Sequence, residues 1–280
     1  MLPKQISSAR PIIWTIAGSD SGGGAGIQTD LHTFHALGAY GCSVITALTA
    51  QNSVAVQAIE YTSVAMLTAQ INALEADLPA KAIKLGMLGT ATIMQTIIPL
   101  LQRFSGPVVC DPVMVASSGA SLFAADAKAF FVENILSQAY LLTPNIPEAE
   151  ALTGIKIDNT TMMREAADKL LILGAKKVLL KGGHGKNAYC QDFFTDGTQS
   201  FYVVSPRNPQ PHTHGSGCTI AAAITACLSL EYTLQDAIVI AKAYVNQGIR
   251  RAQAYGKGPG PLAHGAWPSE QQDLPWVEVV

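Results

Sequence analysis

The segment His214-Gly215-Ser216-Gly217-Cys218-Thr219 has the residue types and spacing best suited to chemistry, and it opens a predicted helix of small residues. Two glycines at a helix N-terminus form a nest of backbone N–H groups that suits a phosphate or a developing anion. Cys218 would lie in the first turn, where the helix dipole lowers the pKa of a thiol, so it is a candidate base or nucleophile. The alternative is a small thiol packed at a helix start, but packing does not readily explain glycines on both sides of Ser216.

A glycine-rich segment, Gly18–Gly26, follows the first predicted strand and leads into a helix. Its glycines would allow the backbone to approach a ligand closely, and the helix offers unpaired N–H groups. The dinucleotide-binding pattern GxGxxG fails, because a match that starts at Gly22 ends on Ile27. A flexible tight turn is the alternative. Asp30, one turn into the helix, faces either solvent or a ligand.

Lys181 ends another predicted strand and starts a segment that is similar to a P-loop. The P-loop pattern GxxxxGK[ST] is nevertheless excluded, because Leu180 stands at its first position and Asn187 at its last. At the end of a buried strand, Lys181 is well placed to meet an anionic ligand. The alternative is a lysine that only extends its ammonium group into solvent.

Two carboxylates and an amide are candidate oxygen ligands for hydrated magnesium. Asn145 and Glu148 directly follow a predicted strand, and together they would suit this cation. Pro147 and Glu148 also mark a helix start, so Glu148 could serve the helix dipole alone, and spacing by itself favours this interpretation. Asp111, which closes another strand, carries the same ambiguity.

The elements that would position these residues alternate between short apolar runs and helical patterns. The predicted strands are Ile12–Ala17, Cys42–Ala50, Ala82–Leu88, Val108–Val113, Tyr140–Thr143 and Val178–Lys181. The predicted helices are Ile27–Leu37, Val64–Leu74, Ala91–Arg103, Ala124–Leu136, Met162–Leu173, Gly217–Leu230 and Leu234–Ala254. This alternation predicts an α/β fold with a mostly parallel sheet that helices cover on both faces, and ligands collect at the carboxyl ends of such strands.

Two further features complete the predicted fold. Runs 188–195 and 199–204 flank Asp196-Gly197, which predicts a hairpin and therefore an antiparallel edge of the sheet. No composition shift, repeat or long polar linker divides the chain, so residues 1–280 are expected to form one domain. The tails 1–10 and 268–280 are expected to be peripheral.

Composition excludes several classes of protein. The chain has 280 residues, 49% of them hydrophobic and 14% charged, with a formal net charge of −2, so it is neither disordered nor a carrier of a basic nucleic-acid footprint. Its longest charge-free stretch, 31–59, is broken by glycine and amide residues into pieces of roughly 15 residues, short of the ~20 that a membrane-spanning helix needs. Five cysteines without a CxxC pair fit a reducing cytosol, so we expect a cytoplasmic protein.

Taken in order, these segments make the chain similar to the ribokinase superfamily, and within it to the hydroxymethylpyrimidine/phosphomethylpyrimidine kinases of thiamin biosynthesis. The resemblance extends from about residue 12 to residue 267. It is carried by the motifs TIAGSDSGGGAGIQTDLHTFHALGAYGCSVITALTAQN, KLGMLG, DPVMVASSG, LLTPNIPEAE, LLKGGH, HGSGCT and HGAW.

The resemblance implies a ribokinase-like three-layer sandwich and phosphoryl transfer from ATP, with Mg²⁺, to the hydroxymethyl oxygen of a pyrimidine. Members of the subgroup then convert the monophosphate to the diphosphate. The implied pyrimidine pocket comprises Gly18, Asp30, Gln51, Met87 and Val113. Gln51 suits an aminopyrimidine because an amide offers both a donor and an acceptor. A homodimer is expected.

The resemblance also implies roles around the phosphates. Asp111 and Glu148 would organise magnesium, and Cys218 would take the proton of the hydroxyl group. The groups implied to hold ATP or the transferring phosphoryl group are Asn145, Lys181, Thr213, Gly215, Ser216 and Gly217. Most of the superfamily has aspartate at the position of Cys218, and cysteine is typical of the pyrimidine-kinase and pyridoxal-kinase branch.

Two departures and two alternatives accompany this prediction. The glycine-rich loop lacks the proline that is usual in the family, and Ser117 stands where the family often has lysine, which bears on the second phosphorylation. A pyridoxal/pyridoxine kinase of the same fold is the nearer alternative, and Gln51 favours the pyrimidine. The more distant alternative is a non-catalytic protein that binds a small ligand.

Overall fold

The computed structural model describes residues 9–115, 119, 122–124, 127–183 and 188–280. Ser117 and residues 184–187, which the sequence analysis singled out, lie outside this part of the chain. The described strands form one sheet in the order β10-β9-β8-β7-β6-β5-β4-β1-β2-β3. Their bounds are β1 Ile12–Asp20, β2 Tyr40–Gln51, β3 Val56–Tyr61, β4 Ala82–Leu85, β5 Val108–Cys110, β6 Leu141–Leu142, β7 Val178–Leu180, β8 Tyr189–Thr195, β9 Ser200–Pro206 and β10 Trp276–Val279.

Helices cover both faces of this sheet, as predicted. Their bounds are α1 Gly26–Ala36, α2 Val64–Asp77, α3 Ala91–Arg103, α4 Ala127–Phe130, α5 Ile146–Thr153, α6 Thr160–Ile172, α7 Ser216–Ser229 and α8 Leu234–Arg250. Alternate strand residues enter two separate cores: Trp14 belongs to the core that also contains residues of α2, α3 and α6, whereas its neighbour Ile13 belongs to the core that contains residues of α1, α7 and α8. Burial on both faces explains why the parallel strands are continuously apolar.

The centre of the sheet is parallel and both of its edges are antiparallel. β2, β1, β4, β5, β6 and β7 pair in parallel, whereas β7-β8-β9-β10 and β2-β3 pair antiparallel. The hairpin predicted around Asp196-Gly197 is confirmed as β8 and β9. Because the carboxyl ends of the parallel strands lie at one edge of the sheet, the loops that follow them gather there.

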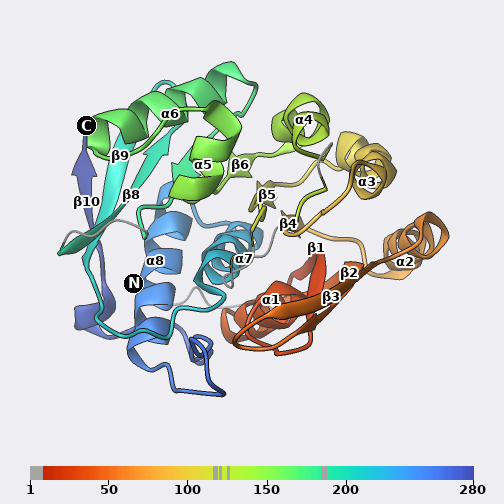
Figure 1. Cartoon of the computed structure of the whole chain (residues 1–280), viewed down its shortest axis with the longest axis horizontal. Coiled ribbons are helices and arrows are strands. Elements are labelled where there is room, and N and C mark those ends of the chain that lie inside the picture. The colour runs from red at the N-terminus through yellow and green to blue at the C-terminus, as the bar shows by residue number, and fades with distance from the viewer. Residues whose placement is uncertain (1–8, 116–118, 120–121, 125–126, 184–187) are drawn as a thin grey trace.

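Some predicted elements were wrong. The C-terminal tail is not merely peripheral, because β10 extends the sheet beside β9, with Trp276 opposite Val204 (Figure 1). An edge strand is exposed on several sides, so its sequence lacks the apolar run of a central strand. The helix predicted over 124–136 is only α4 followed by a π-helical turn, Phe131–Ile135, and a 3₁₀ turn, Leu136–Gln138. The sequence analysis missed β3 and recognised only the start of α5.

In the described part of the chain, no helix has both the length and the apolar content needed to cross a bilayer.

Candidate active site

The segments singled out by the sequence surround one cavity of about 620 Å³ at the carboxyl ends of the parallel strands. It is lined by loops after β1, β2, β4, β5, β6 and β7 and by the N-terminus of α7. The predicted site residues that line it are Gly18, Gln51, Met87, Asp111, Val113, Asn145, Glu148, Lys181, Thr213, Gly215, Ser216, Gly217 and Cys218. Tertiary structure therefore brings residues from 18 to 218 to a single site.

The nest at the start of α7 depends on glycine at two positions. Gly215 has a φ of 80°, and a Cβ there would collide with the backbone carbonyl of Gly24. A Cβ at Gly217 would lie 3.2 Å from Nζ of Lys181, so its absence leaves room for the ammonium group. The N-terminus of α7 is thus open toward the cavity and packed against the first glycine-rich loop, where its backbone N–H groups favour an anion.

Lys181 supplies a fixed positive charge beside this nest. Its Nζ donates a hydrogen bond of 2.6 Å to Oδ1 of Asp111, and both side chains are almost wholly buried. Burial alone would lower the pKa of Lys181, but the carboxylates of Asp111 and Glu148 outweigh it and raise this pKa. Lys181 therefore stays protonated and can neutralise a bound anion.

Asn145 and Glu148 form a reciprocal cap at the start of α5. The side chain of Asn145 accepts the N–H of Glu148 at 2.9 Å, and Oε2 of Glu148 accepts the N–H of Asn145 at 2.8 Å. Both residues also line the cavity, so the structural interpretation is confirmed and the role in binding magnesium stays a prediction. Burial raises the pKa of Glu148 to about 7, although the ammonium group of Lys181 opposes this shift.

These oxygens suit a hydrated cation rather than an all-protein cage. Among the described residues, no group of three or more histidines, cysteines or carboxylates is arranged to hold a metal. Mg²⁺ is usually bound through one or two carboxylates together with substrate phosphates and water. Asp111 and Glu148, with the amide of Asn145, supply that number of ligands at one side of the cavity.

The pKa of Cys218 moves in the direction opposite to the predicted one. Burial raises the pKa of this thiol to about 11, and the nearby charge of Lys84 and the N–H of Gly26 only partly offset it. The helix-dipole argument was therefore wrong in its result, because loss of hydration outweighs the positive end of α7.

Asp30 does not line the cavity, contrary to the prediction that it belongs to the substrate pocket. Its side chain has no exposed surface, and Oδ2 accepts hydrogen bonds from Nζ of Lys84 at 2.8 Å and from Oγ1 of Thr15 at 2.6 Å. Lys84, the ion-pair partner of Asp30, is the residue that lines the site. The sequence analysis missed Lys84, although a lysine inside an apolar strand was a signal that could have found it.

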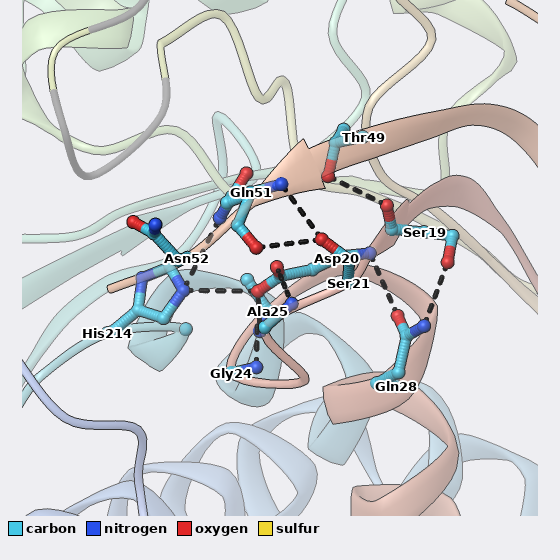
Figure 2. Close-up of polar contacts among 12 residues, drawn as sticks. Ser19, Asp20, Ser21, Gly24, Ala25, Gln28, Thr49, Gln51, Asn52 and His214 are labelled. Carbon is cyan, nitrogen blue, oxygen red and sulfur yellow. Dashed lines mark hydrogen bonds and ion pairs between the residues drawn. The ribbon is translucent and has the colours of Figure 1, made fainter. Parts of the chain in front are cut away.

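Asp20 organises the first glycine-rich loop from within. Its carboxylate accepts the backbone N–H groups of Gly22 at 2.8 Å, Gly24 at 3.1 Å and Ala25 at 2.9 Å (Figure 2). Nε2 of His214 lies 3.2 Å from the same carboxylate. The loop is therefore a closed turn whose N–H groups bond Asp20, and it forms one wall of the cavity.

His214 connects this loop to the candidate substrate residue Gln51. Nε2 of Gln51 lies 3.5 Å from Nε2 of His214, and the backbone N–H and carbonyl of Gln51 both bond the hydroxyl of Ser21 (Figure 2). The backbone of Gln51 is therefore anchored, and its side-chain amide lies beside the ring of His214. The sequence analysis did not assign Asp20 or the contact of His214 with it, because the two residues are 194 positions apart.

Comparison with known proteins agrees with this geometry. A family model described as phosphomethylpyrimidine kinase matches residues 20–263. The thiamine biosynthesis bifunctional protein ThiED of Geobacter sulfurreducens is 47% identical over 91% of this chain, which spans 52% of that protein. A hydroxymethylpyrimidine/phosphomethylpyrimidine kinase of Haemophilus influenzae is 44% identical over 94% of this chain and 99% of that protein.

A solved structure supports the ribokinase-like fold. Pyridoxal kinase from Staphylococcus aureus, in complex with AMP-PCP and pyridoxal, has a TM-score of 0.87 at 30% identity and covers 98% of this chain and 99% of its own. The family model spans far more than half of the sequence, and the relatives match along nearly the same length. The chain belongs to the phosphomethylpyrimidine kinase family.

Proposed function

We propose that this protein transfers the γ-phosphoryl group of ATP to the hydroxymethyl oxygen of 4-amino-5-hydroxymethyl-2-methylpyrimidine, and then phosphorylates the monophosphate to the diphosphate. The observation that carries the proposal is that one cavity is lined both by Gln51, whose backbone is fixed by the hydroxyl of Ser21, and by the cationic nest of Lys181 and α7. An aminopyrimidine and a phosphate chain need these two kinds of group. The names of the relatives support the same substrate.

The chemistry follows from these positions. The hydroxyl oxygen of the pyrimidine attacks the γ-phosphorus, the bond from phosphorus to the ADP oxygen breaks, and Cys218 takes the hydroxyl proton. Phosphoryl transfer asks the protein mainly for alignment and neutralisation of charge. The N–H groups of residues 215–218 stabilise the equatorial oxygens, and Lys181 neutralises their charge. Glu148 and Asp111 would hold Mg²⁺, which would supply positive charge that offsets the charge of the phosphates.

A pyridoxal kinase is the second candidate, and one observation favours it. The S. aureus pyridoxal kinase has a high TM-score, and pyridoxal also carries a hydroxymethyl group on a methyl-bearing heteroaromatic ring. Sequence identity favours the pyrimidine, at 44% for the kinase from H. influenzae against 30% for the pyridoxal kinase. Gln51, anchored by Ser21, also suits an aminopyrimidine.

Steady-state kinetics with ATP and each acceptor tests the proposal. We expect a higher kcat/KM for hydroxymethylpyrimidine than for pyridoxal, and the reverse order would contradict it. Chromatography that separates the monophosphate from the diphosphate tests the second transfer, for which Ser117 is the position of interest. Binding of both ligands without any product would support the non-catalytic alternative instead.

Two further parts of the proposal concern the state of the protein. We expect a homodimer, because β3 is an antiparallel edge strand and Leu48, Val54, Val64 and Met66 are exposed apolar side chains near it. Light scattering would measure the mass in solution, and a monomer would contradict this expectation.

All five cysteines are free thiols, which fits the cytoplasmic location predicted from the sequence.

A further inference from the structure

Gln51, the residue proposed to recognise the acceptor ring, lies at an end of β2 that the neighbouring strands hold only in part. The last pair in the described ladder between β1 and β2 joins Asp20 to Thr49, two positions before Gln51. On the other side, the pairing of β2 with β3 shifts register between Ala50 and Gln51. Such a shift disrupts a ladder locally. The position of Gln51 at the cavity therefore depends on contacts outside the regular sheet.

The hydroxyl group of Ser21 takes the place of a strand partner at this point. It donates a hydrogen bond of 2.7 Å to the backbone carbonyl of Gln51 and accepts one of 2.8 Å from the backbone N–H of the same residue (Figure 2). A hydroxyl group can donate and accept at once, as a strand partner does with its N–H and carbonyl groups. Ser21 is exposed and is not among the described residues that line the cavity, whereas Gln51 lines it. A hydroxyl group outside the cavity thus fixes the backbone of a residue in its wall.

The loop that carries Ser21 is itself fixed, so this hydroxyl group has a defined position. The carboxylate of Asp20 accepts three backbone N–H groups within residues 22–25. The loop also packs closely against the end of β2, because a Cβ at Gly22 would lie 3.3 Å from the carbonyl oxygen of Gln51. Ser21 therefore belongs to a closed turn that is in contact with the strand end it holds.

A second contact limits the amide of Gln51. Nε2 of His214 lies 3.5 Å from the amide nitrogen of Gln51 and 3.2 Å from Oδ2 of Asp20 (Figure 2). A Cβ at Gly24 would collide with Cδ2 of His214, so the imidazole ring packs directly against the loop backbone. The same loop therefore reaches the backbone of Gln51 through Ser21 and its amide through His214.

We propose that Ser21 is a positioning residue for recognition of the acceptor: its hydroxyl group holds the end of β2 so that the amide of Gln51 meets the acceptor ring in one orientation. The inference rests on the proposed function, in which Gln51 binds the pyrimidine. An amide recognises an aminopyrimidine when its donor and its acceptor face the matching ring groups. Order that exists before binding lowers the entropy cost of binding, so loss of this order weakens affinity.

Isothermal titration calorimetry with 4-amino-5-hydroxymethyl-2-methylpyrimidine tests the proposal without turnover. We expect Ser21→Ala to raise the Kd by about threefold to tenfold, the effect of losing one hydrogen-bonding group. Ser21→Thr keeps the hydroxyl group and should stay within about twofold of the wild type. In steady-state kinetics, Ser21→Ala should raise the KM for the pyrimidine and leave kcat and the KM for ATP unchanged, because the lost order concerns binding alone.

Combination with Gln51→Ala distinguishes positioning from a general structural role. Once the amide is gone, the Ser21 hydroxyl has no recognition group to orient, so Ser21→Ala should not weaken pyrimidine binding further in the Gln51→Ala variant. Additive losses in the double variant would contradict the inference. Thr198→Ala is the matched control, because the hydroxyl group of Thr198 bonds Asp196 in an exposed turn outside the cavity. It should leave the Kd unchanged, and a loss equal to that in Ser21→Ala would also contradict the inference.

The outcomes separate this inference from the proposed function. If the wild type binds the pyrimidine and Ser21→Ala binds it equally well, the inference is overturned and the proposed function stands. If the wild type does not bind the pyrimidine, the proposed function is refuted and this inference with it. Because Ser21 is exposed, the variants are expected to keep the fold, and circular dichroism would verify this.

Discussion

Lys181 and Asp111 are 70 positions apart in the sequence, yet Nζ of Lys181 lies 2.6 Å from Oδ1 of Asp111 at the bottom of the cavity. The pair joins the ends of β7 and β5, two strands that are separated in the sheet by β6. It places a cation beside the nest of α7 and a carboxylate on the side of the proposed magnesium ligands.

Replacement of Lys181 by an uncharged residue should lower the rate of phosphoryl transfer more than it lowers the stability of the fold. In Lys181→Met we expect kcat to fall by about 10²–10³, the usual cost of losing one group that stabilises transition-state charge. Coupled measurement of ADP release would give this value. Lys177→Met is the matched control, since Lys177 packs over the ring of Tyr140 outside the cavity. Equal losses in the two variants would contradict the role of Lys181.

Loss of the Cys218 thiol should affect turnover and spare binding. We expect Cys218→Ala to lower kcat by about 10²–10⁴, the range for removal of a general base, with little change in KM. Cys227→Ala serves as the control, because Cys227 lies on the same helix, is fully buried and does not line the cavity. Near-normal turnover in Cys218→Ala would refute the base assignment.

Gln51 should contribute to binding of the acceptor rather than to the chemical step. Gln51→Ala removes the amide beside His214 but keeps the backbone bonds to Ser21. We expect the KM for the pyrimidine to rise by about tenfold, equivalent to roughly 1.4 kcal/mol for one hydrogen-bonding group, while the KM for ATP stays constant. Gln70→Ala, whose amide bonds the backbone of Ile45, should leave both KM values unchanged. An unaltered pyrimidine KM in Gln51→Ala would exclude the contact.

Asp20 should make the stability of the protein sensitive to acid. Burial alone would raise its pKa, but hydrogen bonds from His214, Gly22 and Ala25 outweigh it and lower this pKa. A carboxyl group with a lowered pKa stabilises the folded state above its unfolded pKa of about 3.9, and this contribution is lost as the pH falls through the folded value. We expect Asp20→Asn to lower the free energy of unfolding at pH 7 by about 1–3 kcal/mol.

Urea unfolding of wild type and Asp20→Asn at pH 7, 5 and 3 would measure this difference. It should be largest at pH 7 and smaller at pH 3. Asp196→Asn, in the exposed turn between β8 and β9, is the control and should cost less, because its N–H partners can bond water instead. A difference between wild type and Asp20→Asn that does not change with pH would contradict the assignment.

Local patterns predicted much of the fold and most of the site. Strand-then-glycine segments placed Gly18, Lys181 and Gly215 at the carboxyl ends of strands or at a helix start, and parallel strands necessarily bring such ends to one side of the sheet. The edge strands β3 and β10 were missed because exposed strands need no continuous apolar run. The contact of Asp20 with His214 and that of Lys84 with Asp30 were missed because the partners lie 194 and 54 positions away in the sequence.

The sequence by itself therefore determined the order of the parallel strands and of most helices, and it identified which loops carry glycines, carboxylates and the cysteine, because these depend on neighbouring residues. Tertiary structure alone decided how those groups are used. It turned Asp30 away from the cavity and onto Lys84, and it raised the pKa of Cys218 where the local helix predicted a lower one. The reason is that hydration depends on everything packed around a group, and segments distant in the sequence supply most of that packing.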